Sequence, residues 1–178
     1  MTKKFKLIMA LLLALIISGG VYAYTYTTAT TTIGVTVVES DFAEVTANLT
    51  GYSAPQVFGK YAGTWPTGTL FDIVPALPDY TGDLVIQVYL VNTGDLVPYY
   101  QHLNMKLEFQ DSASAIADDQ GIAQVLNLQN AAVTFDWSSG NGTSPFYVKL
   151  TGGGYRLHKW KTVTGDYQPQ LWCEVTQR

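Results

Sequence analysis

Short segments in which apolar and polar residues alternate run through most of the chain. Residues 104–110 (NMKLEFQ) show the pattern most clearly, because three apolar side chains alternate with polar or charged ones. Such a period of two predicts a strand with one buried face and one face in water. In residues 83–92 both alternating sets are largely apolar, which predicts a strand in the centre of a sheet.

Similar segments, rich in Val, Ile, Thr, Tyr and Phe and separated by Gly, Pro and Asn-Gly, recur along the chain. About ten short strands of this kind predict an all-β fold with little helix, namely an antiparallel β-sandwich of Ig-like or jelly-roll topology. The further strands are expected at residues 33–38, 42–48, 57–61, 70–74, 131–136, 146–150, 155–160 and 171–176.

Two stretches are harder to place. Residues 112–128 have an ambiguous pattern in which a helix would also fit. The run Gly152-Gly153-Gly154 is expected to form a turn between two strands rather than a phosphate-binding loop.

The first 23 residues have the three parts of a secretory signal peptide. Lysines at positions 3, 4 and 6 precede an apolar run at residues 7–17, and Val21-Tyr22-Ala23 ends the segment with small or compact residues at the positions read by a signal peptidase. We expect cleavage between Ala23 and Tyr24, and therefore an extracellular or cell-surface protein. The alternative is a retained membrane anchor, although the apolar run is shorter than the roughly 20 residues of a span.

Charge and cysteine content narrow the picture of the mature chain. Residues 33–178 have the size of one sandwich domain, preceded by an extended segment at 24–32. Loss of the three signal lysines changes the net charge from −4 to −7, which argues against nucleic acid and anionic lipid as partners. Cys173 is the one cysteine, so no internal disulfide forms, and its place in an apolar strand predicts a buried thiol.

The segment that follows the signal is rich in threonine. Residues 25–36 read TYTTATTTIGVT, with high β-propensity and no charge. One interpretation is a flexible stalk or first edge strand. The other is a donor strand that adds to the sheet of a second copy of the chain, which would build a fibre. The candidate donor-strand residues are Tyr24, Tyr26, Thr28, Thr30 and Thr32.

Recognisable catalytic motifs are missing from the sequence. His102 and His158 are the two histidines, and there is no HExxH, GxSxG, Walker or GxGxxG motif. We therefore expect a protein that is not an enzyme and needs no cofactor. Asp111, Asp118 and Asp119 are expected to be solvated acids, with calcium binding as the alternative.

Aromatic residues suggest a second hypothesis. Trp65, Tyr99 and Tyr100 lie in predicted loops, where exposed rings would stack on sugars or a partner protein. They form a candidate aromatic binding surface, so the alternative function is a carbohydrate-binding or adhesive module with polysaccharide as a partner. Trp137, Trp160 and Trp172 lie in or beside predicted strands and are expected to be interior or half-buried.

Two short motifs resemble a known group. The junction Ser18-Gly19-Gly20-Val21-Tyr22-Ala23-Tyr24 and the later Val91-Asn92-Thr93-Gly94 resemble the TasA/camelysin group of secreted biofilm-matrix and archaeal bundling-pilus subunits. The group commonly continues Ala-Tyr with Phe-Ser-Asp, where this chain has Thr25-Tyr26-Thr27. The resemblance implies a β-sandwich that polymerises through an N-terminal donor strand, and assigns that role to the Thr-rich segment.

Overall fold

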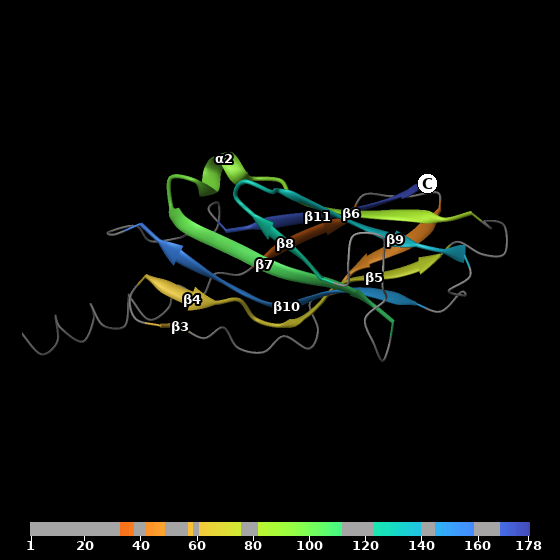
Figure 1. The fold of residues 1–178 in the computed structure, drawn as a ribbon, viewed down its shortest axis with the longest axis horizontal. Helices are drawn as coiled ribbons and strands as arrows, with labels where there is room; N and C mark the ends of the chain where they lie inside the picture. Colours follow the sequence, from red (N-terminus) through yellow and green to blue (C-terminus); the bar gives the residue numbers. More distant parts are fainter. Residues whose placement is uncertain are drawn as a thin grey trace, which may run out of the picture. The chain divides into compact units, whose positions relative to one another are not determined.

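The computed structural model describes residues 33–37, 42–48, 57–58, 61–75, 82–111, 123–139, 145–158 and 168–178. All of them belong to the compact unit Thr31–Arg178, whereas the unit Met1–Thr30 lies outside the described residues. The described part contains eleven strands and one short helix (Figure 1). These elements are β1 (Gly34–Val37), β2 (Ala43–Ala47), β3 (Val57–Phe58), β4 (Ala62–Thr64), β5 (Gly68–Pro75), β6 (Leu84–Leu90), α2 (Thr93–Leu96), β7 (Tyr100–Gln110), β8 (Ala123–Asn127), β9 (Ala132–Trp137), β10 (Phe146–Leu157) and β11 (Gln170–Gln177).

The strands form two sheets. The four-stranded sheet has the order β1-β11-β6-β9. The seven-stranded sheet contains the row β2-β5-β10-β7-β8, with β4 and β3 continuing from β10 on the β5 side. From β5 to β11 the chain changes sheet at every step except between β7 and β8, which pair with each other. This arrangement is that of a jelly roll, so the predicted all-β sandwich is confirmed.

Strand pairing is antiparallel throughout the described residues except at one edge. There β1 runs parallel to β11, with Gly34 opposite Gln170 and Val37 opposite Cys173. Central β6 has β11 on one side and β9 on the other, as its two apolar faces predicted.

The hydrophobic core combines side chains of both sheets. Phe109 and Phe146 of the seven-stranded sheet contact Phe135 and Trp137 of the four-stranded sheet, with ring centroids 5.9 Å apart for Phe109–Phe135 and 5.7 Å for Trp137–Phe146. All four side chains are almost completely buried. Aromatic pairs in such tilted or offset arrangements add to the stabilisation from buried area, so these contacts hold the two sheets face to face.

The predicted turn at the three glycines is wrong, because β10 continues through them. A Cβ atom at Gly153, whose φ is +113°, would lie 2.4 Å from the carbonyl oxygen of Asn104. At Gly154 a Cβ would lie 2.8 Å from the carbonyl oxygen of Gly63. The glycines therefore allow the neighbouring strands to approach β10 closely, next to a bulge between Leu150 and Gly152.

Two strands were not expected. β4 is only three residues long and lies on the same side of β10 as β5, so Trp65 to Thr67 interrupt one row of pairing. β8 falls in the stretch of ambiguous pattern, where residues 123–127 are a strand and residues 112–122 lie outside the described residues. In the described part of the chain no helix is long and apolar enough to be a membrane span.

Candidate functional site

The chain that directly follows the Thr-rich segment is attached to the edge of the four-stranded sheet. Ile33 is buried, Val35 packs against the core, and the backbone N–H of Gly34 donates a hydrogen bond of 3.0 Å to the carbonyl of Pro169. β1 then pairs with the first four residues of β11. The chain is therefore held at this edge from Ile33 onward. The candidate donor-strand residues Tyr24, Tyr26, Thr28, Thr30 and Thr32 lie outside the described residues.

Asn92 holds the part of the chain that receives Gly34. Its side-chain Nδ2 donates to the carbonyl of Gln168 at 2.8 Å, and its Oδ1 accepts from the N–H of Gln170 at 3.0 Å. Its backbone carbonyl accepts from Asp95 and Leu96, at the start of α2. The side-chain amide thus acts as an extra peptide group that extends the β6–β11 pairing past Leu90. This residue belongs to the Val91-Asn92-Thr93-Gly94 motif singled out in the sequence.

The predicted aromatic binding surface is not formed. Trp65 is 3% exposed and Tyr100 is 2% exposed, while Tyr99 is half-buried and packs against the core. Trp65 and Tyr100 instead cluster with Tyr155, with ring centroids 4.8 Å apart for Trp65–Tyr155 and 6.2 Å for Tyr100–Tyr155. The expectation of exposed rings is wrong because both residues adjoin strands and point to the core side. Burial, followed by the nearby Tyr155, raises the pKa of Tyr100 far above its usual value of 10.

Among the residues that the structure describes, the exposed aromatic side chain is that of Trp172, which is 44% exposed on the outer face of β11. Trp137 is buried as expected and Trp160 lies outside the described residues, but Trp172 is more exposed than the interior or half-buried position expected for it. The signal was present in the sequence. Leu171, Cys173 and Val175 are apolar and alternate with it, so Trp172 must face the other way.

Polar groups surround Trp172 on the same face. It lies opposite Tyr89 of β6, and Glu174 lies opposite Gln87. The hydroxyl of Tyr89 donates to Oε1 of Gln87 and lies 3.4 Å from Oε2 of Glu174. Burial and then the Glu174 charge raise the pKa of Tyr89 above 10, so it remains a hydrogen-bond donor at neutral pH. An indole beside a carboxylate, an amide and a phenol is an arrangement that can contact a sugar.

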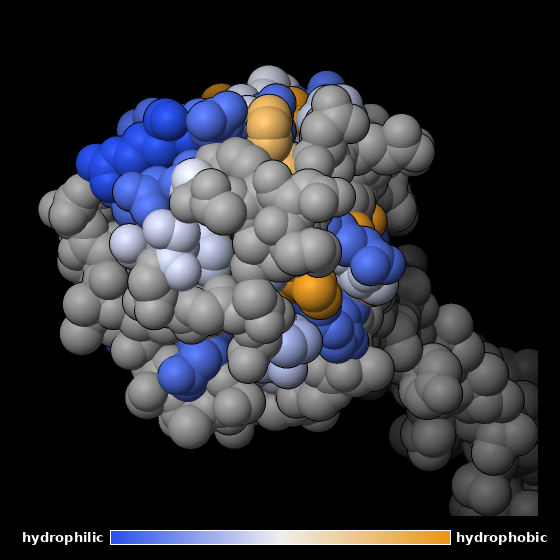
Figure 2. All heavy atoms as spheres, turned by 90° about the vertical axis from the view of Figure 1, so that its right-hand side faces the viewer, coloured by the Kyte–Doolittle hydropathy of each residue, from blue (hydrophilic) through white to orange (hydrophobic). Residues whose placement is uncertain are grey.

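Exposed apolar surface is sparse elsewhere. In the described residues the large hydrophobic side chains that are exposed are Val91, Val97, Val125 and Trp172. On the face in Figure 2 the coloured hydrophobic residues lie singly, separated by hydrophilic ones. Scattered residues of this kind need no binding partner to explain them. Association through a large apolar patch therefore has no support in the described surface.

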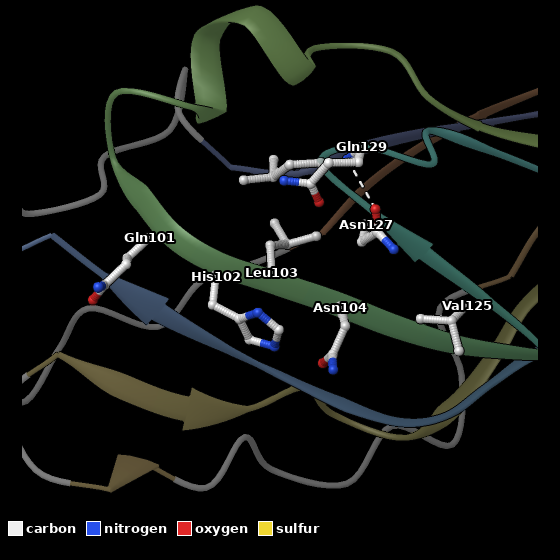
Figure 3. Close-up of a pocket in the computed structure, with 8 residues that line it drawn as sticks. Gln101, His102, Leu103, Asn104, Val125, Asn127 and Gln129 are labelled. Carbon is white, nitrogen blue, oxygen red and sulfur yellow. Dashed lines mark hydrogen bonds between the residues drawn. The ribbon is translucent and has the colours of Figure 1, made fainter.

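A small cavity of about 170 Å³ lies beside β7 and β8 (Figure 3). Its volume is below the roughly 300 Å³ at which small-molecule sites begin. In Figure 3, His102 and Asn104 lie on one side of the β7 ribbon and Gln129 on the other. Amide groups dominate its polar lining, and no carboxylate contributes to it. It is lined by Gln101, His102, Leu103, Asn104, Val125, Asn127, Leu128 and Gln129.

The remaining candidates for chemistry are separated from one another or buried. His102 and His158 are both exposed, and within the described ranges no three residues among His, Cys, Asp and Glu gather into a possible metal site. Asp118 and Asp119 lie outside the described residues, so the expectation of solvated acids and the alternative of calcium binding with Asp111 both stay untested. Cys173 is buried, as predicted, and burial, followed by the Glu174 charge, raises the pKa of its thiol to about 12.

These observations define the class of the protein as a jelly-roll β-sandwich domain. Its first described strand, β1, forms one edge of the four-stranded sheet. Comparison of its sequence with models of protein families and with curated proteins finds no match.

Proposed function

We propose that the protein is a non-enzymatic extracellular structural protein, a self-associating fibre subunit of a cell surface or biofilm matrix, whose residues 24–32 serve as a donor strand. The partner is a second copy of the chain. One observation supports the proposal most strongly. β11 begins at Gln170, opposite Gly34, and the register is parallel. The first described strand after residues 24–32 therefore already lies at the edge of a sheet.

The segment before Gly34 has the properties of an added strand. It is uncharged and rich in residues that favour strands. As a donor strand it would pair with the sheet edge of a second copy, where main-chain hydrogen bonds supply affinity and alternate side chains supply register. Cleavage after Ala23 would release the segment for this role, and retention of the signal would tether the chain to the membrane.

Deletion of residues 24–32 from the secreted protein tests the proposal. We expect a folded monomer by size-exclusion chromatography with light scattering, unchanged far-ultraviolet circular dichroism, and no fibres in negative-stain micrographs. Replacement of the same nine residues by a Gly/Ser sequence keeps the length and should also abolish assembly. Normal fibres from the deleted protein would show that the donor-strand mechanism is wrong.

The second candidate function is a carbohydrate-binding or adhesive module, and the observation that favours it is the position of Trp172. The indole face is exposed beside Glu174 and the Tyr89 hydroxyl, so a sugar ring could stack on it while its hydroxyl groups bond to the polar neighbours. Affinity electrophoresis in gels that contain xylan, β-glucan or chitosan tests it. Trp172→Ala should abolish any retardation, whereas the matched control Val97→Ala should not. An absence of retardation of the unaltered protein in all three gels would remove this candidate.

A further inference from the structure

Two consecutive strands, β8 and β9, are edge strands of different sheets. β8 ends the seven-stranded sheet next to β7, and β9 ends the four-stranded sheet next to β6. Residues 128–131 join them directly, so both edges lie on the same side of the sandwich (Figure 1). An edge of this kind presents unpaired N–H and C=O groups to any second chain, and β-proteins must block such edges if they are to avoid uncontrolled association.

The β9 edge is covered at its middle by a side-chain amide from β8. Nε2 of Gln124 donates to the carbonyl oxygen of Thr134, and the N–H of Thr134 donates to Oε1 of Gln124 at 3.4 Å. A carboxamide offers one acceptor and donors in the same plane, as a peptide group does. Gln124 therefore takes the place that one residue of an added strand would occupy against Thr134.

The β8 edge is covered by Asn130, from the turn between the two strands. Its backbone carbonyl accepts from the N–H of Asn127 at 2.9 Å, and its Nδ2 donates to the carbonyl of Val125 at 3.2 Å. The turn itself is held by Oδ1 of Asn127, which accepts from the N–H groups of Gln129 at 2.8 Å and Asn130 at 2.6 Å. The carbonyl of Val125 and the N–H of Asn127 are thus bonded within the chain.

From these contacts we infer that Gln124 and Asn130 close the β8–β9 side of the domain to strand addition by a second copy of the chain. The Gln124 amide bonds both backbone groups of Thr134, and the Asn130 amide bonds the carbonyl of Val125. An incoming strand must displace them to gain its own hydrogen bonds at these groups. Strand-mediated assembly is thereby restricted to other edges, so copies grow in one direction instead of joining side by side. The inference rests on the proposed function only for the identity of the partner.

The first test measures hydrogen exchange of backbone amides in the secreted protein. Gln124→Ala should raise the exchange rate of the Thr134 amide by about three- to tenfold, as expected for loss of one hydrogen bond, and leave the β6 amides unchanged. Gln124→Glu is the conservative variant, because a carboxylate accepts from the Thr134 N–H but cannot donate to its carbonyl; Thr134 should then remain protected. Gln129→Ala, in the turn between β8 and β9, is the matched control. Its side chain is exposed, and its hydrogen bond to Asn127 comes from the backbone N–H, which the substitution keeps. Equal Thr134 exchange in Gln124→Ala and unaltered protein would overturn the inference.

The second test measures association. The double variant Gln124→Ala, Asn130→Ala should increase thioflavin T fluorescence and bundle fibres laterally in micrographs, whereas Gln129→Ala should not. Destabilisation alone can also cause aggregation, so Asn92→Ala provides a comparison, because it removes side-chain hydrogen bonds to Gln168 and Gln170 and none at the β8 or β9 edge. If Asn92→Ala aggregates as much at equal loss of stability, the association arises from unfolding and the inference is wrong. If the double variant does not fold, the Thr134 exchange of the single variants decides.

Fibres that persist after deletion of residues 24–32 would contradict the proposed function but leave both readouts of the β8–β9 side intact.

Discussion

The side-chain oxygen of Asn92 lies 3.0 Å from the backbone nitrogen of Gln170 and accepts its hydrogen bond. The other half of the same amide binds the carbonyl of Gln168, so Asn92 spans both peptide groups around Pro169. Pro169 in turn accepts the first hydrogen bond of β1, from Gly34. One nearly buried amide therefore aligns β6, β11 and β1 at the point where the N-terminal segment joins the sandwich.

Replacement of Asn92 by alanine should lower the free energy of unfolding by about 2–3 kcal/mol, because two hydrogen bonds are lost and their backbone partners are left without one. Urea denaturation followed by circular dichroism measures the change. Asn92→Asp is the informative control, since it retains the acceptor for Gln170 but loses the donor to Gln168. Its free energy of unfolding should lie between those of the unaltered protein and of Asn92→Ala. A loss below about 0.5 kcal/mol for alanine would contradict the role assigned to Asn92.

Neighbouring glycines of β10 should respond oppositely to alanine. Gly153→Ala places a Cβ within 2.4 Å of a carbonyl oxygen at a φ of +113°, and should cost more than about 2 kcal/mol. At Gly152 no atom lies within 4 Å of the added Cβ, so Gly152→Ala should be neutral or stabilise by up to about 1 kcal/mol through the unfolded state. Urea midpoints of the two variants give the comparison. Equal losses would show that the close approach at Gly153 is not the reason for the glycine.

The thiol of Cys173 should be inert in the folded protein. With a pKa of about 12, only about one thiol in ten thousand is ionised at pH 8, and the side chain is fully buried. A thiol reagent such as 5,5′-dithiobis(2-nitrobenzoic acid) should therefore react only after denaturation, and a non-reducing gel should show no disulfide-linked dimer. Rapid labelling under native conditions would contradict the buried position.

Stability should decrease in acid through carboxylates whose pKa values are lowered in the fold. The backbone N–H of Ser139, which donates to Asp83 at 2.9 Å, lowers the pKa of Asp83 below 3.8. Burial acts to raise the pKa of Glu108, but hydrogen bonds from Lys106, Gln110 and Thr151 outweigh it and lower that pKa below 4.5. Depressed pKa values stabilise the fold above the unfolded-state values, and the contribution is lost as the pH falls below these and through the lower folded-state pKa values.

The melting temperature should therefore be constant near neutral pH and fall below about pH 4.5. Scanning calorimetry from pH 7 to pH 3 measures the profile. Asp83→Asn and Glu108→Gln remove the ionisable groups, so each variant should be less stable at neutral pH and show a smaller fall in acid. If both variants keep the full acid dependence, other carboxylates cause it.

Local alternation was sufficient to predict most of the sandwich. β6 and β7 follow from their own residues, because two apolar faces predict a central strand for β6 and one apolar face predicts a strand with one wet face for β7. The glycines of β10 were misread because a strand glycine and a turn glycine look the same in sequence. Gly153 and Gly154 must be glycine because the backbones of β7 and β4 come too close for a Cβ atom. Both of these strands are distant from β10 along the chain. β4 is too short to carry a periodic signal.

The site residues illustrate the same limit. Trp65 and Tyr100 follow turn-forming residues and were assigned to loops, yet the core lies on their side of the chain. Trp172 could have been placed outward from its apolar neighbours alone. Gln124 and Asn130 carry no local signal, because an amide that binds a strand edge looks like any surface amide until the partner strand is known.

The pairing of β1 with β11 joins residues from nearly opposite ends of the domain. The four-stranded sheet has no β11 between β1 and β6 until Gln170 to Gln177 are available, so its β1 edge cannot close before then. Non-local closure of this kind is also slow, because the entropy of a long loop is lost before the contacts form. The order of the strands therefore delays pairing at this edge of the four-stranded sheet until the whole stretch from Gly34 to Cys173 is available.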